Sequence, residues 1–304
     1  MDVVVFGSIN MDLVVRTLRL PSVGETIIGK EFEMLPGGKG ANQAVAVARL
    51  GTSVAMIGRV GDDVFGSQLV NHLQAAGVMC DRISTAPGES SGVATIEVDA
   101  QGNNHIIVIP GANNLVDAEE LAHLNACLAE AHIVLLQLEI PLSMVIAAAT
   151  IAFEQGLTVI LDPAPVHPEL PDELLRHVSI LTPNQVEASQ LAGFPVETLA
   201  DAHRAAELIQ KKGPETVIVT LGDQGSLCVT SQGVIHMPCM PVEVVDTVAA
   251  GDAFNGGLAT ALVEGKSLRN SLRWATAVAA VAVSRKGAQS AMPKRSELHA
   301  LFTL

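Results

Sequence analysis

Short apolar runs of strand type alternate with segments of helical periodicity along most of the chain, and no other feature constrains the fold as strongly. The apolar runs lie at Val3–Phe6, Val54–Ile57, Ile133–Leu138, Val159–Leu161, Ile180–Leu181 and Val217–Leu221. The segments between them place apolar residues near i, i+3 and i+4, and lie at Ala41–Leu50, Val64–Ala76, Ala118–Glu130, Ser143–Gln155, Asn184–Ala192 and Asp201–Lys212. This alternation predicts an α/β fold in which helices cover both faces of a mainly parallel sheet. Active sites of such sheets lie beyond the carboxyl ends of the strands.

Two regions depart from this alternation and contain no convincing helix. Residues Leu13–Met34 and Gly92–Ile109 alternate polar and apolar side chains as amphipathic strands do. Their strand-like stretches are Thr26–Ile28, Val93–Val98 and His105–Ile109. We expect these stretches to pair as a small separate sheet. The C-terminal third predicts two adjacent helices instead, at Asp252–Glu264 and Ser267–Ser284.

The composition disfavours nucleic acid as a partner. The 304 residues include 32 Asp and Glu but only 18 Lys and Arg, a formal charge of −14. Binding to nucleic acid normally needs a basic excess for the phosphates and aromatic rings for the bases, whereas this chain has seven Phe, one Trp and no Tyr. With 49% hydrophobic residues, the chain must bury a large apolar fraction.

A membrane or secreted location is also disfavoured. The longest uninterrupted apolar stretch, Ala277–Val283, is far shorter than the roughly 18 residues that a spanning helix needs. The first residues lack the basic region of a signal peptide, so we expect a cytoplasmic protein. The four cysteines form no CxxC pair, and the histidines form no HxH or HExxH motif, so neither a zinc site nor a disulfide framework is indicated.

A glycine cluster opens the first predicted helix, in the sequence Pro36-Gly37-Gly38-Lys39-Gly40-Ala41-Asn42-Gln43. Glycines permit close backbone approach, and a helix N-terminus presents free N–H groups to an anionic or hydroxyl-rich ligand. The cluster matches neither the P-loop nor the GxGxxG template. A structural turn and a ligand cradle both remain compatible with the cluster alone.

A second cluster of small residues, Ala249–Gly251, precedes Asp252 in the first turn of a predicted helix. Backbone N–H groups beside a carboxylate suit phosphoryl transfer, because they stabilise the transferred group while the carboxylate accepts a proton. The alternative is that Asp252 only caps the helix. The pair Gly256-Gly257 argues against simple capping, because glycines inside a helix cost stability unless something approaches closely.

Two further polar pairs follow predicted strands. Asn184 and Glu187 lie on one helical face and could hold a hydrated cation, although a capping box explains their spacing better. Asn10 and Asp12 follow the first strand, where they could bind sugar hydroxyls or form an Asx turn.

The order of these segments resembles the ribokinase (PfkB) family of carbohydrate kinases over essentially the whole chain. The resemblance is carried by GSINMD at the start, GGKGANQA at 37–44, QLE at 137–139, TPNQVE at 182–187, VTLGDQG at 219–225, DTVAAGDAFNGG at 246–257 and SRKGAQ at 284–289. It implies a three-layer sandwich with a mainly parallel central sheet of nine or ten strands and a small β-sheet lid. The chain would form one kinase domain, 1–304, with lid strands within 11–36 and 92–110.

The resemblance also implies the chemistry: ATP-dependent phosphorylation of a sugar hydroxyl, with Asp252 as the catalytic base. The anion hole would be formed by the backbone N–H groups of Ala249, Ala250, Gly251 and Asp252. The residues that match sugar ligands of the family are Asn10, Asp12, Gly38, Lys39, Asn42, Ala94, Ile96, Glu139 and Asp252. Those that match its nucleotide site are Asn184, Thr220, Gly222, Gly225, Gly251 and Thr276.

Two cations are implied by the same resemblance. Glu187 would order the water around Mg²⁺. A monovalent cation, usually potassium, would be held mostly through backbone carbonyls by Asp246, Val248, Ala282, Arg285, Gly287 and Ala291. Two positions depart from the family pattern: Thr276 stands where His or Asn is expected near the adenine, and Ala291 replaces a hydroxyl residue.

D-ribose is the expected substrate and D-ribose 5-phosphate the product, because Asn10, Asp12, Lys39, Asn42 and Glu139 all fit the family pattern. The alternatives are 2-deoxyribose, another pentose, fructose or a nucleoside. A non-catalytic sugar-binding regulator is a further alternative, and a nicotinamide oxidoreductase is disfavoured because no GxGxxG follows a strand. A homodimer formed through the lid is expected from similar kinases.

Overall fold

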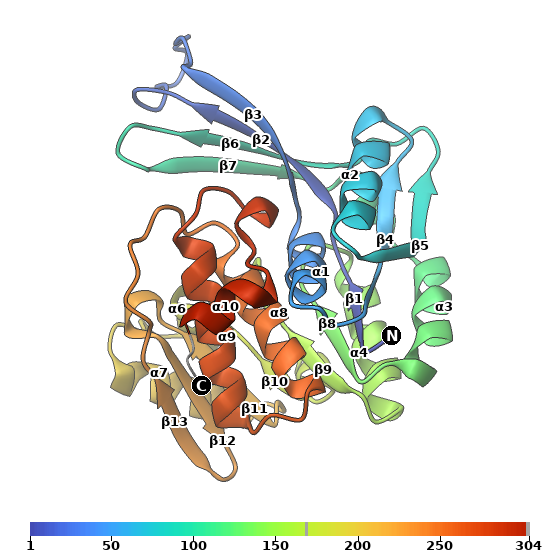
Figure 1. The fold of residues 1–304 in the computed structure, drawn as a ribbon, viewed down its shortest axis with the longest axis vertical. Helices are drawn as coiled ribbons and strands as arrows, with labels where there is room; N and C mark the ends of the chain where they lie inside the picture. Colours follow the sequence, from blue (N-terminus) through green and yellow to red (C-terminus); the bar gives the residue numbers. More distant parts are fainter. Residues whose placement is uncertain (168–169, 302–304) are drawn as a thin grey trace.

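A nine-stranded sheet runs through the middle of the molecule. The computed structural model describes residues 1–167 and 170–301. The strands lie in the order β13-β12-β11-β10-β9-β8-β1-β4-β5, and those from β11 to β5 are parallel, while β12 and β13 pair antiparallel (Figure 1). Their bounds are β1 Val3–Phe6, β4 Val54–Gly61, β5 Met79–Ala86, β8 Ile133–Leu136, β9 Thr158–Leu161, β10 Ile180–Leu181, β11 Thr216–Thr220, β12 Ser226–Thr230 and β13 Gly233–Met237. The predicted α/β fold with a mainly parallel sheet is confirmed.

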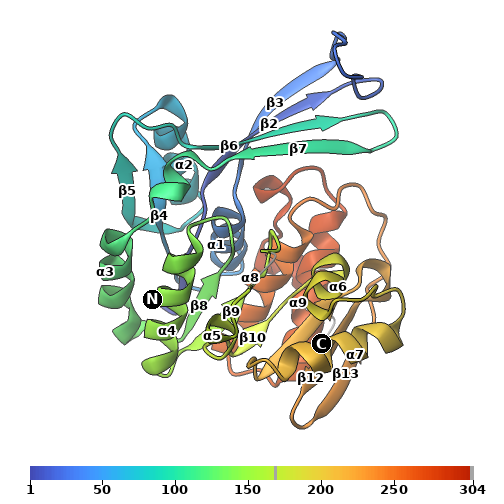
Figure 2. The same ribbon diagram turned by 180° about the vertical axis from the view of Figure 1, so that it is seen from behind.

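Helices cover both faces of this sheet (Figures 1 and 2). Their bounds are α1 Lys39–Arg49, α2 Val64–Ala75, α3 Ala118–Cys127, α4 Leu142–Glu154, α5 Asp172–Leu175, α6 Gln185–Ala192, α7 Leu199–Gln210, α8 Ala250–Val263, α9 Leu268–Val283 and α10 Arg295–Leu301. Successive side chains of β1 enter opposite layers, because a strand alternates its faces. Val3 and Val5 pack with the α1, α8 and α9 layer, whereas Val4 and Phe6 pack with the α3, α4 and α7 layer. This two-sided burial explains why the strands of the sequence are short and wholly apolar.

A second sheet of four strands projects beyond the main sheet as a separate layer (Figures 1 and 2). Its order is β3-β2-β6-β7, and its strands are β2 Asn10–Arg16, β3 Glu31–Gly37, β6 Gly92–Val98 and β7 Asn104–Ile109. We call this sheet the lid. The register pairs Asn10 with Gly92 and Asp12 with Ala94. Residues that pair directly share a face, so Asp12 and Ala94 project from the same side of the lid.

The sequence predictions differ from the structure at several elements. Thr26–Ile28 is not a strand, because the lid strand begins at Glu31, and Ile28 is 94% exposed in the connection before it. Strands β5, β12 and β13 and helices α5 and α10 were not predicted from periodicity. The strands β5 and β13 lie at the edges of the main sheet, where mixed polar and apolar side chains give no clear apolar run.

Helix α8 packs unusually close to its two neighbours. A Cβ atom added at Gly256 would lie 2.5 Å from the Cβ of Ala46 on α1, and one added at Gly257 would lie 2.9 Å from Val278 on α9. The pair Gly256-Gly257 therefore serves the contact between helices. This packing brings the start of α8 next to the start of α1, although some 210 residues separate them along the chain. Within the described residues, no helix is both long and apolar enough to cross a bilayer.

Candidate active site

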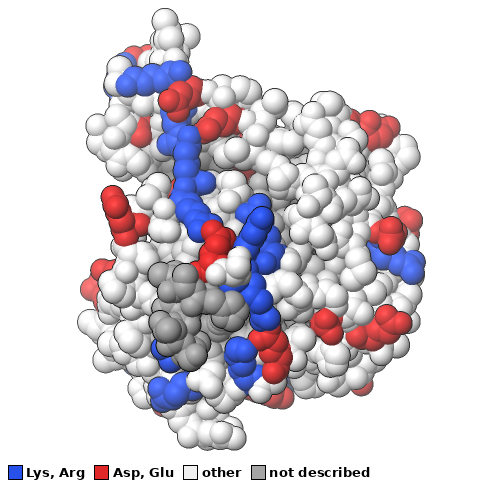
Figure 3. Space-filling view, viewed as in Figure 1, with Lys and Arg blue, Asp and Glu red and all other residues white. Residues whose placement is uncertain are grey.

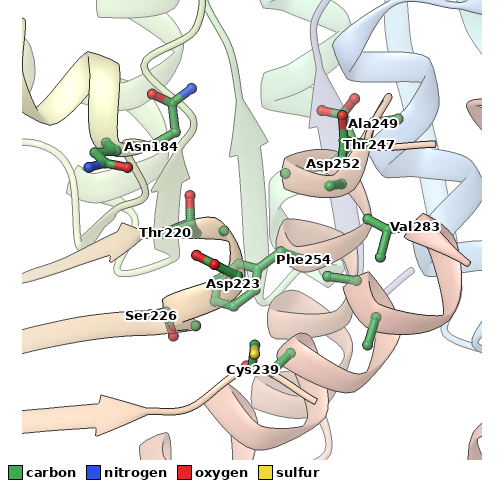
Figure 4. Close-up of a pocket in the computed structure, with 18 of the residues that line it drawn as sticks. Asn184, Thr220, Asp223, Ser226, Cys239, Thr247, Ala249, Asp252, Phe254 and Val283 are labelled. Carbon is green, nitrogen blue, oxygen red and sulfur yellow. The ribbon is translucent and has the colours of Figure 1, made fainter. Parts of the chain in front are cut away.

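A cavity of about 630 Å³ opens at the carboxyl end of the main sheet. Helix α6, the end of β11, the segment before α8 and the helices α8 and α9 supply its walls (Figure 4). Figure 4 shows Asp252 on the first turn of α8 at one end of this cavity, with Asn184 and Thr220 on the opposite wall. Candidate residues from distant parts of the chain therefore meet in one cavity.

Asp252 is buried, at 3% exposure, and both of its oxygens accept hydrogen bonds from α1. Asn42 Nδ2 donates to Oδ2 at 2.9 Å, and Gln43 Nε2 donates to Oδ1 at 3.1 Å. The carboxylate does not cap its helix, because the N-cap is Ala249 and no described side chain caps this end. The capping alternative for Asp252 is therefore wrong.

Burial raises the pKa of Asp252 above the ordinary aspartate value. The Lys39 ammonium and the amides of Asn42 and Gln43 oppose this rise, and the Glu139 carboxylate adds to it. Asp252 thus combines a raised proton affinity with a fixed orientation, and these are the two properties that a general base needs.

The N-terminus of α8 presents backbone N–H groups beside Asp252. Ala249 has a positive φ of 58°, which is uncommon for a residue other than glycine. The turn is followed by Ala250 and Gly251 in the first turn of the helix, where N–H groups lack partners inside the helix. The Ala250 N–H donates to the Thr247 carbonyl, before the helix, at 3.3 Å. Nothing lies within 4 Å of a Cβ added at Gly251, so the space in front of this turn is open. Such an N-terminus favours an anion.

The predicted sugar residues gather beside Asp252, under the lid. Glu139 Oε2 accepts from the Lys39 backbone N–H at 3.0 Å and from Ser8 Oγ at 2.6 Å. Gly38 has a φ of 87°, and a Cβ there would lie 2.6 Å from the Asn10 nitrogen, so glycine is required. The structure therefore brings the Gly38 loop, the end of β1 and the end of β8 together.

Three more predicted residues lie on one face of the lid. Asp12 pairs directly with Ala94, so these two residues share a face of the lid. Ile96 lies two residues after Ala94 on the same strand and therefore projects from the same face. Burial raises the pKa of Asp12 to about 7, and the nearby carboxylates of Glu139 and Asp252 raise it as well. The Asp12 carboxyl group on the lid is therefore close enough to Asp252, the candidate base, to be affected by its charge.

The opposite wall of the cavity contains the capping box of Asn184 and Glu187 that their spacing in the sequence predicted. Glu187 N–H donates to Asn184 Oδ1 at 2.9 Å, and Asn184 N–H donates to Glu187 Oε2 at 2.7 Å. Glu187 is only 8% exposed, and burial raises its pKa. The remaining predicted nucleotide residues line the same cavity: Thr220, Gly222, Gly225, Gly251 and Thr276. The hydroxyl of Thr276 donates to the Leu272 carbonyl of its own helix at 2.8 Å.

The predicted cation residues come from two neighbouring segments. Asp246 joins these segments, because Oδ1 accepts from the Val248 N–H at 3.1 Å and Oδ2 accepts from the Gly287 N–H at 3.0 Å. The Arg285 guanidinium pairs with Glu297 at 2.6 Å, so this side chain points to another partner. Ala282 and Ala291 are both buried.

Sequence reasoning missed four polar residues that hold the candidate site together. Gln43, Gln137 and Asp162 form a hydrogen-bonded group with Asp252. Asn113 donates from Nδ2 to Asn10 Oδ1 at 2.7 Å and accepts from the Ile9 N–H at 2.9 Å, so it fixes the Asn10 amide. No local motif marks these partners, apart from the position of Gln43 inside the glycine cluster and of Gln137 beside Glu139.

A family model described as pfkB family carbohydrate kinase matches residues 1–295. The chain belongs to this family. It is therefore a phosphotransferase that acts on an alcohol group of a carbohydrate. The resemblance read from the sequence motifs is confirmed.

Several relatives of this pfkB family member are named ribokinases. Ribokinase of Haemophilus influenzae is 42% identical over 296 residues, which cover 96% of this chain and 95% of the relative. Deoxyribokinase of Salmonella typhi is 36% identical and covers 100% of this chain and 99% of its own. The solved structure of Arabidopsis thaliana ribokinase complexed with ribose and ATP superposes with a TM-score of 0.91 at 37% identity, covering 100% of this chain and 99% of that one. The three-layer fold with a separate small sheet is thus that of ribokinases.

Proposed function

We propose that this carbohydrate kinase transfers the γ-phosphoryl group of ATP to D-ribose and forms D-ribose 5-phosphate. The observation that carries the proposal is the position of Asp252. It lies buried at the N-terminus of α8, between the predicted sugar residues and the cavity that Asn184 and Thr220 line. The ribokinase names of the relatives, and the ribose and ATP bound to the Arabidopsis thaliana protein, support this substrate pair.

The proposed reaction uses the chain's own groups in a simple order. Asp252 accepts the proton of the ribose 5-hydroxyl while the hydroxyl oxygen forms a bond to the γ-phosphorus of ATP. The bond from that phosphorus to the bridging oxygen breaks, and this oxygen leaves as part of ADP. The N–H groups of Ala249, Ala250 and Gly251 face the charge on the transferred group. Asn10, Asp12, Lys39 and Glu139 hold the sugar hydroxyls, and Ala94 and Ile96 exclude water from above.

Two cations complete the proposal. The buried Glu187 carboxylate fits a hydrated Mg²⁺ bound with ATP, because oxygen ligands and retained water suit this ion, which neutralises phosphate charge. The segments of Asp246 and Gly287 fit K⁺, because Asp246 holds them side by side so that their backbone carbonyls can serve as ligands. With its guanidinium paired to Glu297, Arg285 would contribute only its carbonyl oxygen.

We also propose a homodimer formed through the lid. All six residues of β7 are exposed, and Ile106, Ile107, Val108 and Ile109 leave 46–64% of their surface open. An edge strand that is apolar on both faces normally needs a cover. We further infer that residues 1–304 act as one kinase unit, and that it works in the cytoplasm, where ATP is available.

The substrate is tested by measuring ADP release with ribose, 2-deoxyribose, fructose, arabinose and adenosine, in potassium and in sodium salts. We expect ribose to give the highest kcat/KM, with faster turnover in potassium. A higher value for 2-deoxyribose would support the second candidate, which the Salmonella typhi relative favours, and equal rates in both salts would remove the K⁺ site.

The base is tested by Asp252→Asn, which keeps the size of the side chain and removes the proton acceptor. We expect kcat to fall about 10²–10⁴-fold while calorimetry still detects ribose binding. Asp81→Asn, an exposed aspartate on β5, is the matched control and should keep the parent rate. Turnover by Asp252→Asn near the parent level would contradict the proposed mechanism.

A further inference from the structure

A second buried carboxylate, Asp162, lies beside Asp252 and has no role in the reaction described above. It follows β9 directly, is 5% exposed, and its backbone N–H donates to the Leu136 carbonyl at 2.9 Å, so its position is fixed. Its Oδ2 atom accepts from Gln43 Nε2 at 3.1 Å and lies 3.9 Å from Lys39 Nζ. A fully buried carboxylate is costly unless its partners justify it.

One amide nitrogen links the two carboxylates. Gln43 Nε2 is 3.1 Å from Asp162 Oδ2 and also 3.1 Å from Asp252 Oδ1. An amide nitrogen has two hydrogens, so it can donate one to each carboxylate. The Gln43 Oε1 atom accepts from Gln137 Nε2 at 2.7 Å, and both glutamines are completely buried. Gln137 therefore holds the Gln43 amide in the orientation that serves both acids.

The surrounding charges act on both carboxylates. Burial raises the pKa of Asp162 and of Asp252, and the Lys39 ammonium on α1 opposes both rises. The other ionisable groups that face the pair are acidic: Glu139 after β8, Glu187 on α6 and Asp12 on the lid. The Lys39 ammonium thus acts on both members of the pair.

We propose that Asp162 is a positioning residue that acts on Asp252 through the shared Gln43 amide and sets the pH range in which Asp252 takes a proton. The two buried carboxylates are coupled, so a charge on one disfavours a second charge on the other, and, besides burial, the Asp252 charge is among the causes that raise the pKa of Asp162 to about 8. The Gln43 N–H groups favour the charged form of each carboxylate. The charge and the hydrogen bond therefore have opposite effects, and each can be removed separately. The proposal rests on the proposed function only for the identity of Asp252 as the base.

The experiment compares Asp162→Asn with Gln43→Met. The asparagine keeps an oxygen that accepts from Gln43 but removes the charge, so the acidic limb of the kcat–pH profile should move down by about one pH unit. The methionine removes the donor to Asp252, so the same limb should move up. A residue that only supports the fold would lower kcat without moving the limb, and that result in Asp162→Asn would overturn the proposal.

A second readout does not depend on turnover. The carboxyl carbon of Asp252, assigned by comparison with Asp252→Asn, is titrated by ¹³C NMR in the free protein and in both variants. Asp252 pKa values that shift in opposite directions in Asp162→Asn and Gln43→Met support the proposal, even if ribose is not the substrate. An Asp252 pKa that is equal in the parent and in Asp162→Asn contradicts it. Asp81→Asn controls for the removal of any one carboxylate. If Gln43→Met does not fold, Asp162→Asn alone decides, because it is nearly isosteric with the parent.

Discussion

Asp12 illustrates how a single residue can carry a pH dependence into substrate binding. Its pKa is raised to about 7, first by burial and then by the Glu139 and Asp252 carboxylates. In the proposed function, the ionised form accepts hydrogen bonds from the sugar hydroxyls, whereas the protonated form, which dominates below pH 7, has lost the charge that strengthens these bonds. Sugar affinity should therefore be complete above pH 8 and should decrease as the pH falls through 7.

This prediction is measured as the KM for ribose between pH 6 and pH 8.5, with the KM for ATP as the internal control. The KM for ribose should rise by no more than about tenfold for each pH unit below 7, while the KM for ATP changes little. Asp12→Asn should bind ribose weakly at every pH and remove the dependence. A ribose KM that stays flat in the parent would show that Asp12 does not titrate in this range.

Individual side chains were predictable where one motif holds them and not where several segments meet. Asn42 and Asp252 each belong to a recognisable run, and the structure joins them by a hydrogen bond. Gln43, Gln137 and Asp162 escaped prediction, because their relation depends on how α1 packs against the ends of β8 and β9. Sequence spacing does not contain that geometry.

At the scale of elements, the contact between α1 and α8 sets the distance between the Asn42–Gln43 pair and Asp252. Gly256 permits this contact, because an added Cβ would meet the Ala46 Cβ at 2.5 Å and two backbone atoms at 3.2 Å. Neither side can yield without moving a helix. We therefore expect Gly256→Ala to lower the free energy of unfolding by about 1–3 kcal/mol.

Urea denaturation of Gly256→Ala tests this contact. Gly251→Ala in the same helix is the control, because nothing lies within 4 Å of its added Cβ and alanine is the better helix former. The double variant Ala46→Gly with Gly256→Ala should recover part of the loss, since it removes the opposing methyl group. A Gly256→Ala protein as stable as the parent would show that α8 moves freely.

Elements buried on two sides were predicted well, and elements at the margins were not. The core helices differ from their predicted bounds by at most three residues at either end, and the central strands overlap the predicted apolar runs. The lid was predicted as a small sheet, but its second strand begins at Glu31 and not at Thr26, because the connection before it stays exposed. Alternation predicts a strand's faces but not where pairing begins.

Charge is distributed unevenly over the whole molecule. The overall balance is −14, yet residues 266–295 contain seven of the 18 Lys and Arg and no acidic residue. Figure 3 shows a band of basic side chains, with some acidic ones among them, that runs down one face of the molecule from the lid. Several are paired, such as Lys286 with Glu33 on the lid at 2.8 Å and Arg285 with Glu297 at 2.6 Å. The overall charge of −14 therefore does not indicate how this face is stabilised.

The lid dimer is a prediction for the molecule as a whole. Sedimentation equilibrium of the parent should give twice the mass of one chain, which is 31.6 kDa. Ile107→Lys places a charge on the exposed edge strand and should give a monomer, because an edge lysine opposes strand pairing. Val234→Lys is the control on β13, an edge strand of the main sheet, and should remain a dimer. A monomeric parent protein would contradict the proposed assembly.

The packing of α1 against α8 has a consequence for how the chain is made. Strand β1 and helix α1 leave the ribosome first, but α8, which covers α1, begins only at Ala250. Until then Ala41, Ala44 and Val45, all fully buried in the finished protein, lack their largest helical partner. The nascent chain therefore exposes an apolar helix face through most of its synthesis. In the proposed function, phosphoryl transfer can begin only once α8 has docked on α1 and brought Asp252 next to Asn42 and Gln43.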